Sequence, residues 1–171
     1  MINKPGIENP LTVENLRTEP SKYNILVVDD EELIRKLVVS FLSKLGHSCL
    51  TAVDGVDALN QLKGHKIDVV ITDIKMPNMD GIMLTGEISS KYPNLPVLVM
   101  TAFDEEYSAG TAISVGAQEF IKKPFSLDEF ALRLHKMIND SKTLRGLKSE
   151  KNGNEDMQDL VNELESVLKK Y

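Results

Sequence analysis

Acidic, hydroxyl and amino side chains follow four of the five apolar stretches in this 171-residue chain. Asp29 and Asp30 come directly after the first stretch, and Asp73 comes after the third. Thr101 follows the fourth stretch, and Lys123 comes shortly after the fifth. The carboxyl ends of parallel strands meet at one edge of a sheet. If the stretches are strands, these five side chains are expected to gather at that edge.

Each of these side chains also has an interpretation that involves no chemistry. Asp29 and Asp30 could cap a following helix, because Asp is a favoured N-cap residue. Asp73 could be a turn former, and Thr101 could be an ordinary hydroxyl at a strand end. Lys123 alone could be a solvated surface side chain. The joint placement of all five is what favours a functional site.

The chemistry predicted for such an edge is magnesium-dependent phosphoryl transfer. Carboxylates about 5 Å apart repel by a few kcal/mol per pair at an effective dielectric constant of roughly 20. A fold tolerates this when a pKa rises or a cation binds, and carboxylate oxygens suit hydrated Mg2+. Lys123 and Thr101 would add a charge and a hydrogen bond to a phosphoryl group, whose transfer depends on positioning and charge neutralisation. Asp73 would be the nucleophile that forms an acyl phosphate.

Apolar stretches and helical periods alternate along the chain. Asn24–Val28 is a continuous apolar run, typical of a strand that is covered on both faces. Further strands are predicted at Cys49–Val53, Ile67–Thr72, Pro96–Met100 and Glu119–Ile121. Helices are expected after each strand, near residues 34–45, 55–62, 81–91, 105–115 and 126–138. This alternation predicts an α/β fold, a doubly wound parallel sheet with helices on both faces.

Four motifs around these side chains resemble those of a known family. They are Val27-Val28-Asp29-Asp30-Glu31, Thr72-Asp73-Ile74-Lys75-Met76-Pro77-Asn78-Met79-Asp80-Gly81, Met100-Thr101-Ala102 and Ile121-Lys122-Lys123-Pro124-Phe125. In this order they resemble the receiver domain of bacterial two-component response regulators, of the chemotaxis type. The resemblance implies a flavodoxin-like fold of five parallel strands in the order 2-1-3-4-5, followed here by a C-terminal helical extension.

The resemblance also implies roles for single residues. Asp73 would be phosphorylated by a sensor histidine kinase or a phosphotransfer protein. Mg2+, with Mn2+ as an alternative ion, would be held by Asp30, Asp73 and the backbone carbonyl of Lys75. Asp29 would act on the ion through water. The peptide bond between Lys123 and Pro124 would be cis, a form that proline allows at small cost.

Four residues are expected to tune or report the switch. By the resemblance, Thr101 moves toward the phosphoryl group, and Phe120 on the fifth strand swings inward behind it. Plain core packing is the alternative interpretation of Phe120. Lys75 and Phe103 would flank the path of the hydrolytic water, which predicts slow autodephosphorylation. The alternative is that both of these side chains point to solvent.

Composition and charge exclude several classes of protein. The formal net charge is -6, which argues against a nucleic-acid-binding surface because phosphate neutralisation needs clustered Lys and Arg. The sequence contains no run of about 18 apolar residues that could span a membrane. Residues 1–20 lack the apolar centre of a signal peptide, and the single cysteine, Cys49, cannot form an internal disulfide. A cytoplasmic protein is therefore expected.

Three segments are expected along the chain. Residues 1–21 read as a flexible leader, residues 22–140 as the receiver domain, and residues 141–171 as a linker followed by an amphipathic helix. The predicted final helix carries a stripe of apolar side chains at helical spacing: Met157, Leu160, Val161, Leu164, Val167 and Leu168. Because an isolated helix of this length is marginal in water, it should pack against the domain, a second copy or a partner.

No motif of a separate output enzyme is visible in the sequence. The expected output is contact with a downstream protein effector, through the face of the fourth and fifth helices or through the tail helix. A homodimer through either surface is a further expectation, and neither direct nucleic-acid binding nor membrane contact is expected. Two other functions compete: a protein-binding module that works without phosphorylation, and a phosphatase of the haloacid dehalogenase class. The latter needs D-x-D-x-[TV] after its first strand, which Asp29-Asp30-Glu31-Glu32 does not supply.

Overall fold

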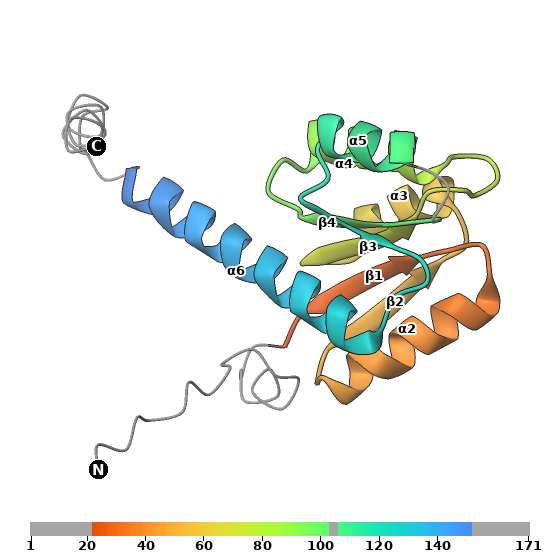
Figure 1. The fold of residues 1–171 in the computed structure, drawn as a ribbon. Coiled ribbons are helices and arrows are strands. Elements are labelled where there is room, and N and C mark those ends of the chain that lie inside the picture. Colours follow the sequence, from red (N-terminus) through yellow and green to blue (C-terminus); the bar gives the residue numbers. More distant parts are fainter. Residues whose placement is uncertain (1–21, 103–105, 152–171) are drawn as a thin grey trace, which may run out of the picture. The chain divides into compact units, whose positions relative to one another are not determined.

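The structure, a computed structural model, describes residues 22–102 and 106–151 (Figure 1). Its internal contacts divide the chain into two units, Met1–Asn139 and Asp140–Tyr171. The expected leader and the apolar stripe of residues 157–168 lie outside the described residues. Within the described ranges, no helix is long and apolar enough to cross a membrane.

A five-stranded parallel sheet forms the centre of the first unit, with its strands in the order β2-β1-β3-β4-β5. This order confirms the doubly wound fold expected from the sequence. The strands are β1 (Asn24–Val28), β2 (Ser48–Ala52), β3 (Val69–Asp73), β4 (Val97–Thr101) and β5 (Glu119–Lys122). β1, β3 and β4 are buried almost throughout, because helices cover both faces of the sheet.

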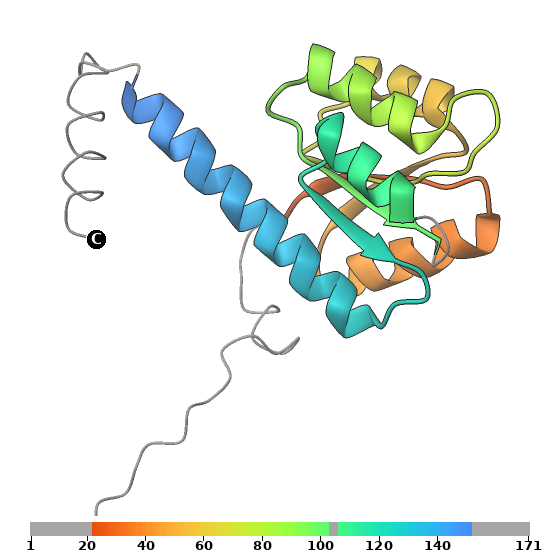
Figure 2. The ribbon, with the colours of Figure 1, turned by 45° about the horizontal axis from the view of Figure 1, so that its top comes forward.

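Helices lie on both faces of this sheet (Figures 1 and 2). They are α2 (Glu32–Lys44), α3 (Gly55–Gly64), α4 (Gly81–Lys91), α5 (Glu106–Ser114) and α6 (Leu127–Lys151). Alternate strand residues face opposite sides, so each strand supplies two apolar cores. Ile25 and Val27 of β1 belong to the core with α2 and α6, whereas Leu26 and Val28 belong to the core with α3, α4 and α5.

Two expectations about the helices need correction. Leu37 has the spacing of the apolar face in the helix expected near residues 34–45, but the residue is 52% exposed, and only Val38 and Leu42 of α2 are buried. The segment after Ser141 was expected to be a linker, but α6 continues through it to Lys151. The residues of that segment are mostly good helix formers, and the one interruption, Gly146, costs a helix only about 1 kcal/mol.

Cys49 is a free thiol on the edge strand β2. It is half-buried beside the core that contains α2 and α6. Burial raises the pKa of this thiol to about 11, because it penalises the charged thiolate. The side chain therefore serves as a small apolar packing group rather than a nucleophile.

Candidate functional site

Three carboxylates meet at the carboxyl edge of the sheet, as the sequence predicts. Asp29 and Asp30 directly follow β1, and Asp73 is the last residue of β3. β1 and β3 are neighbours, with Val28 paired to Thr72, so their ends coincide. One carboxylate oxygen from each residue lies within 4.8 Å of the others. Asp29 and Asp73 are buried, whereas Asp30 is exposed to solvent.

Lys123 reaches this cluster from the loop after β5. Its Nζ lies 3.2 Å from Oδ1 of Asp73 and 3.3 Å from Oδ2 of Asp29. The backbone amide of Lys123 donates a hydrogen bond of 2.6 Å to the carbonyl of Thr101, which ties this loop to the end of β4. The Lys123–Pro124 peptide bond is cis, in agreement with the resemblance. One ammonium group thus faces two buried carboxylates.

The charges of this cluster shift the pKa values of its members. Burial raises the pKa of Asp73; the charge of Lys123 acts in the opposite direction, and the charge of Asp29 adds to the rise. Burial alone would lower the pKa of Lys123, but the charges of Asp73 and Asp29 together outweigh it, so this pKa is raised. Lys123 therefore stays charged, and Asp73 is a more basic carboxylate than an ordinary aspartate.

Asp29 serves both the site and the start of α2. Its Oδ1 accepts a hydrogen bond of 2.9 Å from the backbone amide of Glu31, and its other oxygen faces Lys123. Arg35 donates a hydrogen bond of 2.6 Å from Nη1 to the backbone carbonyl of Asp29. The N-cap residue of α2 is Glu31, which makes no side-chain cap hydrogen bond, so the helix-capping interpretation of Asp29 and Asp30 is wrong. The Asp29 side chain instead holds the turn before the helix. Sequence reasoning did not identify Arg35 as a support, because this contact depends on the turn between β1 and α2.

Thr101 is fully buried at the end of β4. It stands one residue beyond Met100, the partner of Asp73 in the sheet register, so it lies at the same edge as the acids. Its hydroxyl donates a hydrogen bond of 3.0 Å to the carbonyl of Ala102. Phe103, the next residue along, lies outside the described residues.

The loop between β3 and α4 is fastened at both ends. Gly81 donates a backbone hydrogen bond of 2.8 Å to the carbonyl of Ile74, and a Cβ at Gly81 would collide with the carbonyl oxygen of Asp73. Asn78 has a φ of 64° and donates a hydrogen bond of 2.7 Å to Oδ2 of Asp54, at the start of α3. Lys75 lies in this loop with an exposed side chain.

Asp54 and Asn78 are supporting residues that sequence reasoning missed. Asp54 also accepts a hydrogen bond of 2.8 Å from the backbone amide of Asp57, which caps α3. These two hydrogen bonds lower the pKa of Asp54, and the bond from the Asp57 amide has the larger effect. The Asp54-Gly55 turn was visible in the sequence, but its partner is 24 residues away, and no local pattern signals such a contact.

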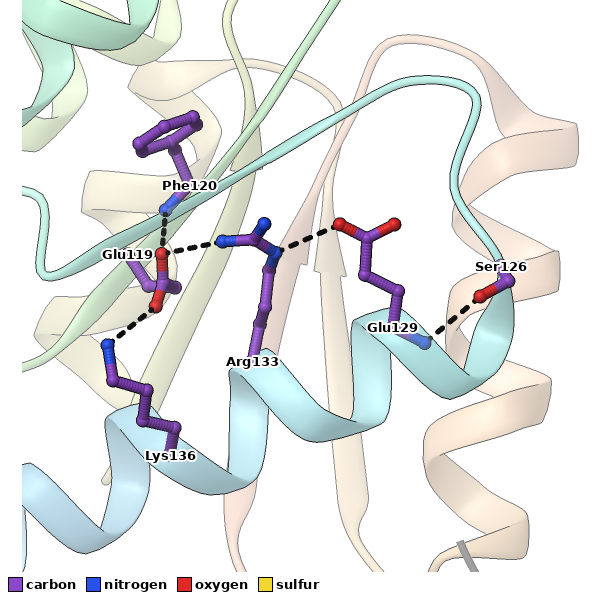
Figure 3. Close-up of polar contacts among 6 residues, drawn as sticks. All are labelled: Glu119, Phe120, Ser126, Glu129, Arg133 and Lys136. Atoms are coloured by element: carbon purple, nitrogen blue, oxygen red, sulfur yellow. Dashed lines mark hydrogen bonds and ion pairs between the residues drawn. The ribbon is translucent and has the colours of Figure 1, made fainter. Parts of the chain in front are cut away.

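Phe120 on β5 is partly buried against the core formed with α3, α4 and α5. Figure 3 shows its surroundings, where Arg133 and Lys136 of α6 contact Glu119, the first residue of β5. The structure thus places the expected switch aromatic on the sheet edge next to α6. Sequence reasoning did not single out Glu119 or Arg133, because their contact joins residues 14 positions apart on different elements.

An apolar cavity of about 400 Å³ adjoins the acidic cluster at Lys123. It lies between α2 and the loop after β5 and is lined by Ile34, Leu37, Val38, Ala102, Lys123, Pro124 and Phe125. Leu37, together with the 79% exposed Leu33, presents apolar surface to solvent on α2. The cavity therefore offers an apolar surface within reach of the charged site.

The profile of the response regulator receiver domain matches residues 25–135. This chain belongs to the response regulator receiver domain family. Proteins of this family accept a phosphoryl group on an aspartate. The acidic cluster, the paired lysine and the strand order of this receiver domain are thus the features of a phosphoacceptor fold.

Relatives and solved structures agree with this assignment. The receiver domain is similar to the alkaline phosphatase synthesis transcriptional regulatory protein PhoP of Bacillus subtilis (strain 168), with 31% identity over 147 residues that cover 86% of this chain and 61% of PhoP. The crystal structure of NtrX from Brucella abortus has a TM-score of 0.72 at 36% identity and covers 75% of this chain and 29% of that chain. A receiver domain protein from Clostridium thermocellum has a TM-score of 0.67 at 32% identity and covers 71% of this chain and 98% of that chain.

Several of these relatives are longer proteins. The chain spans 53%, 32% and 61% of the length of three curated relatives that it matches, all named as transcriptional regulators. Their additional length lies outside the similarity. The matches therefore identify the receiver domain and leave its output to be inferred.

Proposed function

We propose that Asp73 accepts the phosphoryl group from a sensor histidine kinase or a phosphotransfer protein, as one step of a phosphorelay. The observation that carries this proposal is the contact of 3.2 Å between Asp73 and Lys123 in a cluster of three acids. Burial makes Asp73 more basic than an ordinary carboxylate, and 11% of its side chain is exposed at the edge of the sheet. A carboxylate of this kind is a suitable nucleophile toward phosphorus.

Lys123 and Thr101 have separate roles in the proposed reaction. Lys123 neutralises charge on the transferring group from the side of β5, because its ammonium already lies between the carboxylates of Asp29 and Asp73. Thr101 gives a hydrogen bond to a phosphoryl oxygen after its hydroxyl leaves the carbonyl of Ala102. Phosphoryl transfer needs this positioning and charge compensation more than it needs covalent chemistry from the protein.

The donor set fits Mg2+, and Mn2+ as a substitute. Three carboxylate oxygens within 4.8 Å of one another are hard ligands, and one of the three residues, Asp30, is open to solvent, as an ion that retains water requires. Asp30, Asp73 and the backbone carbonyl of Lys75 would hold the ion, and Asp29 would act through water. The bound ion would compensate the negative charge on the phosphoryl oxygens.

The apolar cavity beside Lys123 supports a protein as the phosphodonor. Leu33 and Leu37 of α2 expose apolar side chains at or near this cavity, next to the charged cluster. A donor protein that covers them would exclude water from the reacting groups, which strengthens the electrostatic contacts there. The apolar surface and the acceptor carboxylate therefore form one docking area.

The proposed output is a change of protein contacts. Phe120 would move inward behind Thr101 and alter the face built from the fourth and fifth helices of the fold, α5 and α6, for a downstream effector or a second copy. Residues 22–140 would form the receiver unit of a cytoplasmic protein that catalyses only its own phosphorylation and dephosphorylation. No direct contact with nucleic acid or membrane is proposed. Lys75 and Phe103 would slow the loss of the phosphoryl group.

The experiment treats the full chain with acetyl phosphate and Mg2+, followed by mass spectrometry. The expected product is a hydroxylamine-labile adduct of about 80 Da, the mass of a phosphoryl group on an acyl phosphate, at Asp73. The Asp73→Asn variant should lose this adduct. Asp68→Asn is the matched control, because Asp68 accepts a hydrogen bond from Asn24 at the amino end of β1, away from the cluster. An adduct on another residue, or no adduct with any competent donor, would refute the proposal and favour a phosphorylation-independent binding module.

A further inference from the structure

Arg133 of α6 lies over the aromatic ring of Phe120 on β5. The guanidinium carbon is 5.9 Å from the ring centroid, within the range of a cation–π contact. Phe120 is partly buried, and the side chain of Arg133 is 36% exposed, so the contact lies at the margin of the core. The ring therefore contacts both the apolar core and a cation.

Two carboxylates fix the guanidinium in this place. Arg133 donates from Nη1 to Oε1 of Glu119 and from Nε to Oε1 of Glu129, each at 3.1 Å. Glu119 belongs to β5, and Glu129 belongs to the first turn of α6, where Ser126 accepts its backbone amide at 3.1 Å. Because the anchors come from two elements, the guanidinium cannot follow the ring without breaking a charge-assisted hydrogen bond.

Glu119 joins the backbone of Phe120 to the same network. Its Oε1 accepts both the Arg133 guanidinium and the backbone amide of Phe120, each at 3.1 Å. Lys136 approaches Oε2 of Glu119 at 3.5 Å but makes no described contact with the ring. Glu119 is only 8% exposed, so its carboxylate needs these hydrogen-bond partners to offset the cost of burial. Arg133 and Lys136 thus share one carboxylate, and only Arg133 also covers the ring.

We propose that Arg133 is a positioning residue that stabilises the present orientation of Phe120 against its inward movement. This inference rests on the proposed function, in which Phe120 responds to phosphorylation of Asp73. The inward orientation loses the cation–π contact, whereas the ion pairs of Arg133 with Glu119 and Glu129 remain. Arg133 therefore sets how easily the ring moves.

Thermodynamic coupling predicts how much the loss of Arg133 should change the affinity for a phosphoryl mimic. A contact that favours one of two orientations lowers the affinity for any ligand that requires the other. An exposed cation–π contact corresponds to about a two- to fivefold change in the equilibrium between the two orientations. Loss of Arg133 should therefore tighten the binding of a phosphoryl mimic by up to this factor, although Arg133 touches none of the acids.

The experiment compares the wild-type chain, Arg133→Gln and Lys136→Gln by titration with beryllium fluoride in the presence of Mg2+. Each variant removes one cation from Glu119, but only the first removes the cation from the ring. The protein carries fluorophenylalanine, and the resonance of Phe120 is assigned with Phe120→Leu. Arg133→Gln is expected to bind the mimic about two- to fivefold more tightly and to shift the Phe120 resonance toward its mimic-bound position. Lys136→Gln is expected to leave both unchanged.

Equal affinities of wild type and Arg133→Gln, or an equal effect of Lys136→Gln, would overturn the proposal. Arg133→Met is the second variant if Arg133→Gln does not fold, because it keeps the aliphatic packing of the side chain. The resonance of Phe120 without the mimic separates this inference from the proposed function. If wild type does not bind the mimic, the proposed function fails. The role of Arg133 is refuted separately if Arg133→Gln leaves the Phe120 resonance unchanged in the absence of the mimic.

Discussion

Replacement of Lys123 by Met tests the electrostatics of the acidic cluster most directly. The change removes one ammonium group and keeps most of the aliphatic side chain. Asp29 and Asp73, whose side chains are 0% and 11% exposed, then lose the cation that lies 3.3 and 3.2 Å from their oxygens. Two buried carboxylates remain close together without compensation, so the folded state should become less stable.

The size of the loss follows from these distances and burials. A unit charge pair at 3.2 Å is worth about 5 kcal/mol at an effective dielectric constant of roughly 20, before the cost of desolvation. Removal of one partner from a buried pair costs about 3–5 kcal/mol. Because the Lys123 side chain is 24% exposed, solvent screens part of the interaction. We therefore expect the free energy of unfolding to fall by about 3 kcal/mol at pH 7.5 without divalent ions.

The dependence of the stability of Lys123→Met on pH is an independent test of the same electrostatics. Burial already raises the pKa of Asp73, and loss of Lys123 removes the charge that opposes this rise. In Lys123→Met the folded state therefore retains the proton of Asp73 at a pH where the unfolded state, with a pKa of about 3.9, has lost it. Stability falls as pH rises through the raised pKa, so the deficit relative to wild type should be smaller at pH 5 than at pH 7.5.

Urea unfolding of four proteins measures these effects: wild type, Lys123→Met, Asp73→Asn and the double variant. The double variant should be more stable than Lys123→Met, because it lacks one of the uncompensated charges, and the cycle gives the coupling energy. Lys66→Met is the matched control, since Lys66 is exposed on the surface. A Lys123→Met protein within about 1 kcal/mol of wild type, or a deficit that neither Asp73→Asn nor acid reduces, would refute the reasoning.

Three further predictions address the ion, the loop and the half-buried His47. Asp30→Asn should abolish the stabilisation of the fold by Mg2+, which for wild type is about 1.4 kcal/mol at a Mg2+ concentration of ten times the dissociation constant. If Mg2+ raises the melting temperature of the variant as much as that of wild type, Asp30 is not a ligand. Asn78→Ala should destabilise by about 1–2 kcal/mol, because it loses the hydrogen bond to Asp54 and places Ala at a positive φ. Asn78→Gly, which tolerates that φ, should lose less in the same urea assay, and equal losses would mean that backbone strain contributes nothing. Burial lowers the pKa of His47, so the unfolded chain takes up its proton first as pH falls below about 6.5. Stability should therefore decline from pH 7.5 to pH 5.5, and His47→Gln should flatten that part of a melting-temperature profile; a slope equal to that of wild type would contradict this.

The sequence predicted those parts of the site that depend on strand ends. Asp29 and Asp73 follow apolar runs, and parallel pairing then brings their side chains to one edge whatever the details of the loops. The strand boundaries differ by one or two residues from the expected ones: β2 is Ser48–Ala52 instead of Cys49–Val53. Backbone pairing sets these limits, and side-chain hydrophobicity reports them only indirectly.

The missed features depend on tertiary partners. Leu37 fits the apolar period of its helix, yet the residue is 52% exposed and borders the cavity beside Lys123. The contacts of Asn78 with Asp54 and of Arg133 with Glu119 each join different elements. Polar side chains at such positions look like ordinary surface residues in a sequence, because the pattern does not show which group lies opposite.

The thiol of Cys49 provides a built-in chemical probe for the opening of the edge strand β2. Because burial raises the pKa of Cys49 to about 11, the reactive thiolate is scarcer at pH 8 while β2 is docked than it is in an exposed cysteine. Detachment of β2 would return the thiol to an ordinary acidity and so hasten its alkylation for as long as the strand is free. The rate of modification by a small alkylating reagent would then measure how often β2 detaches from the sheet. The measurement needs no introduced label and leaves the acidic cluster intact.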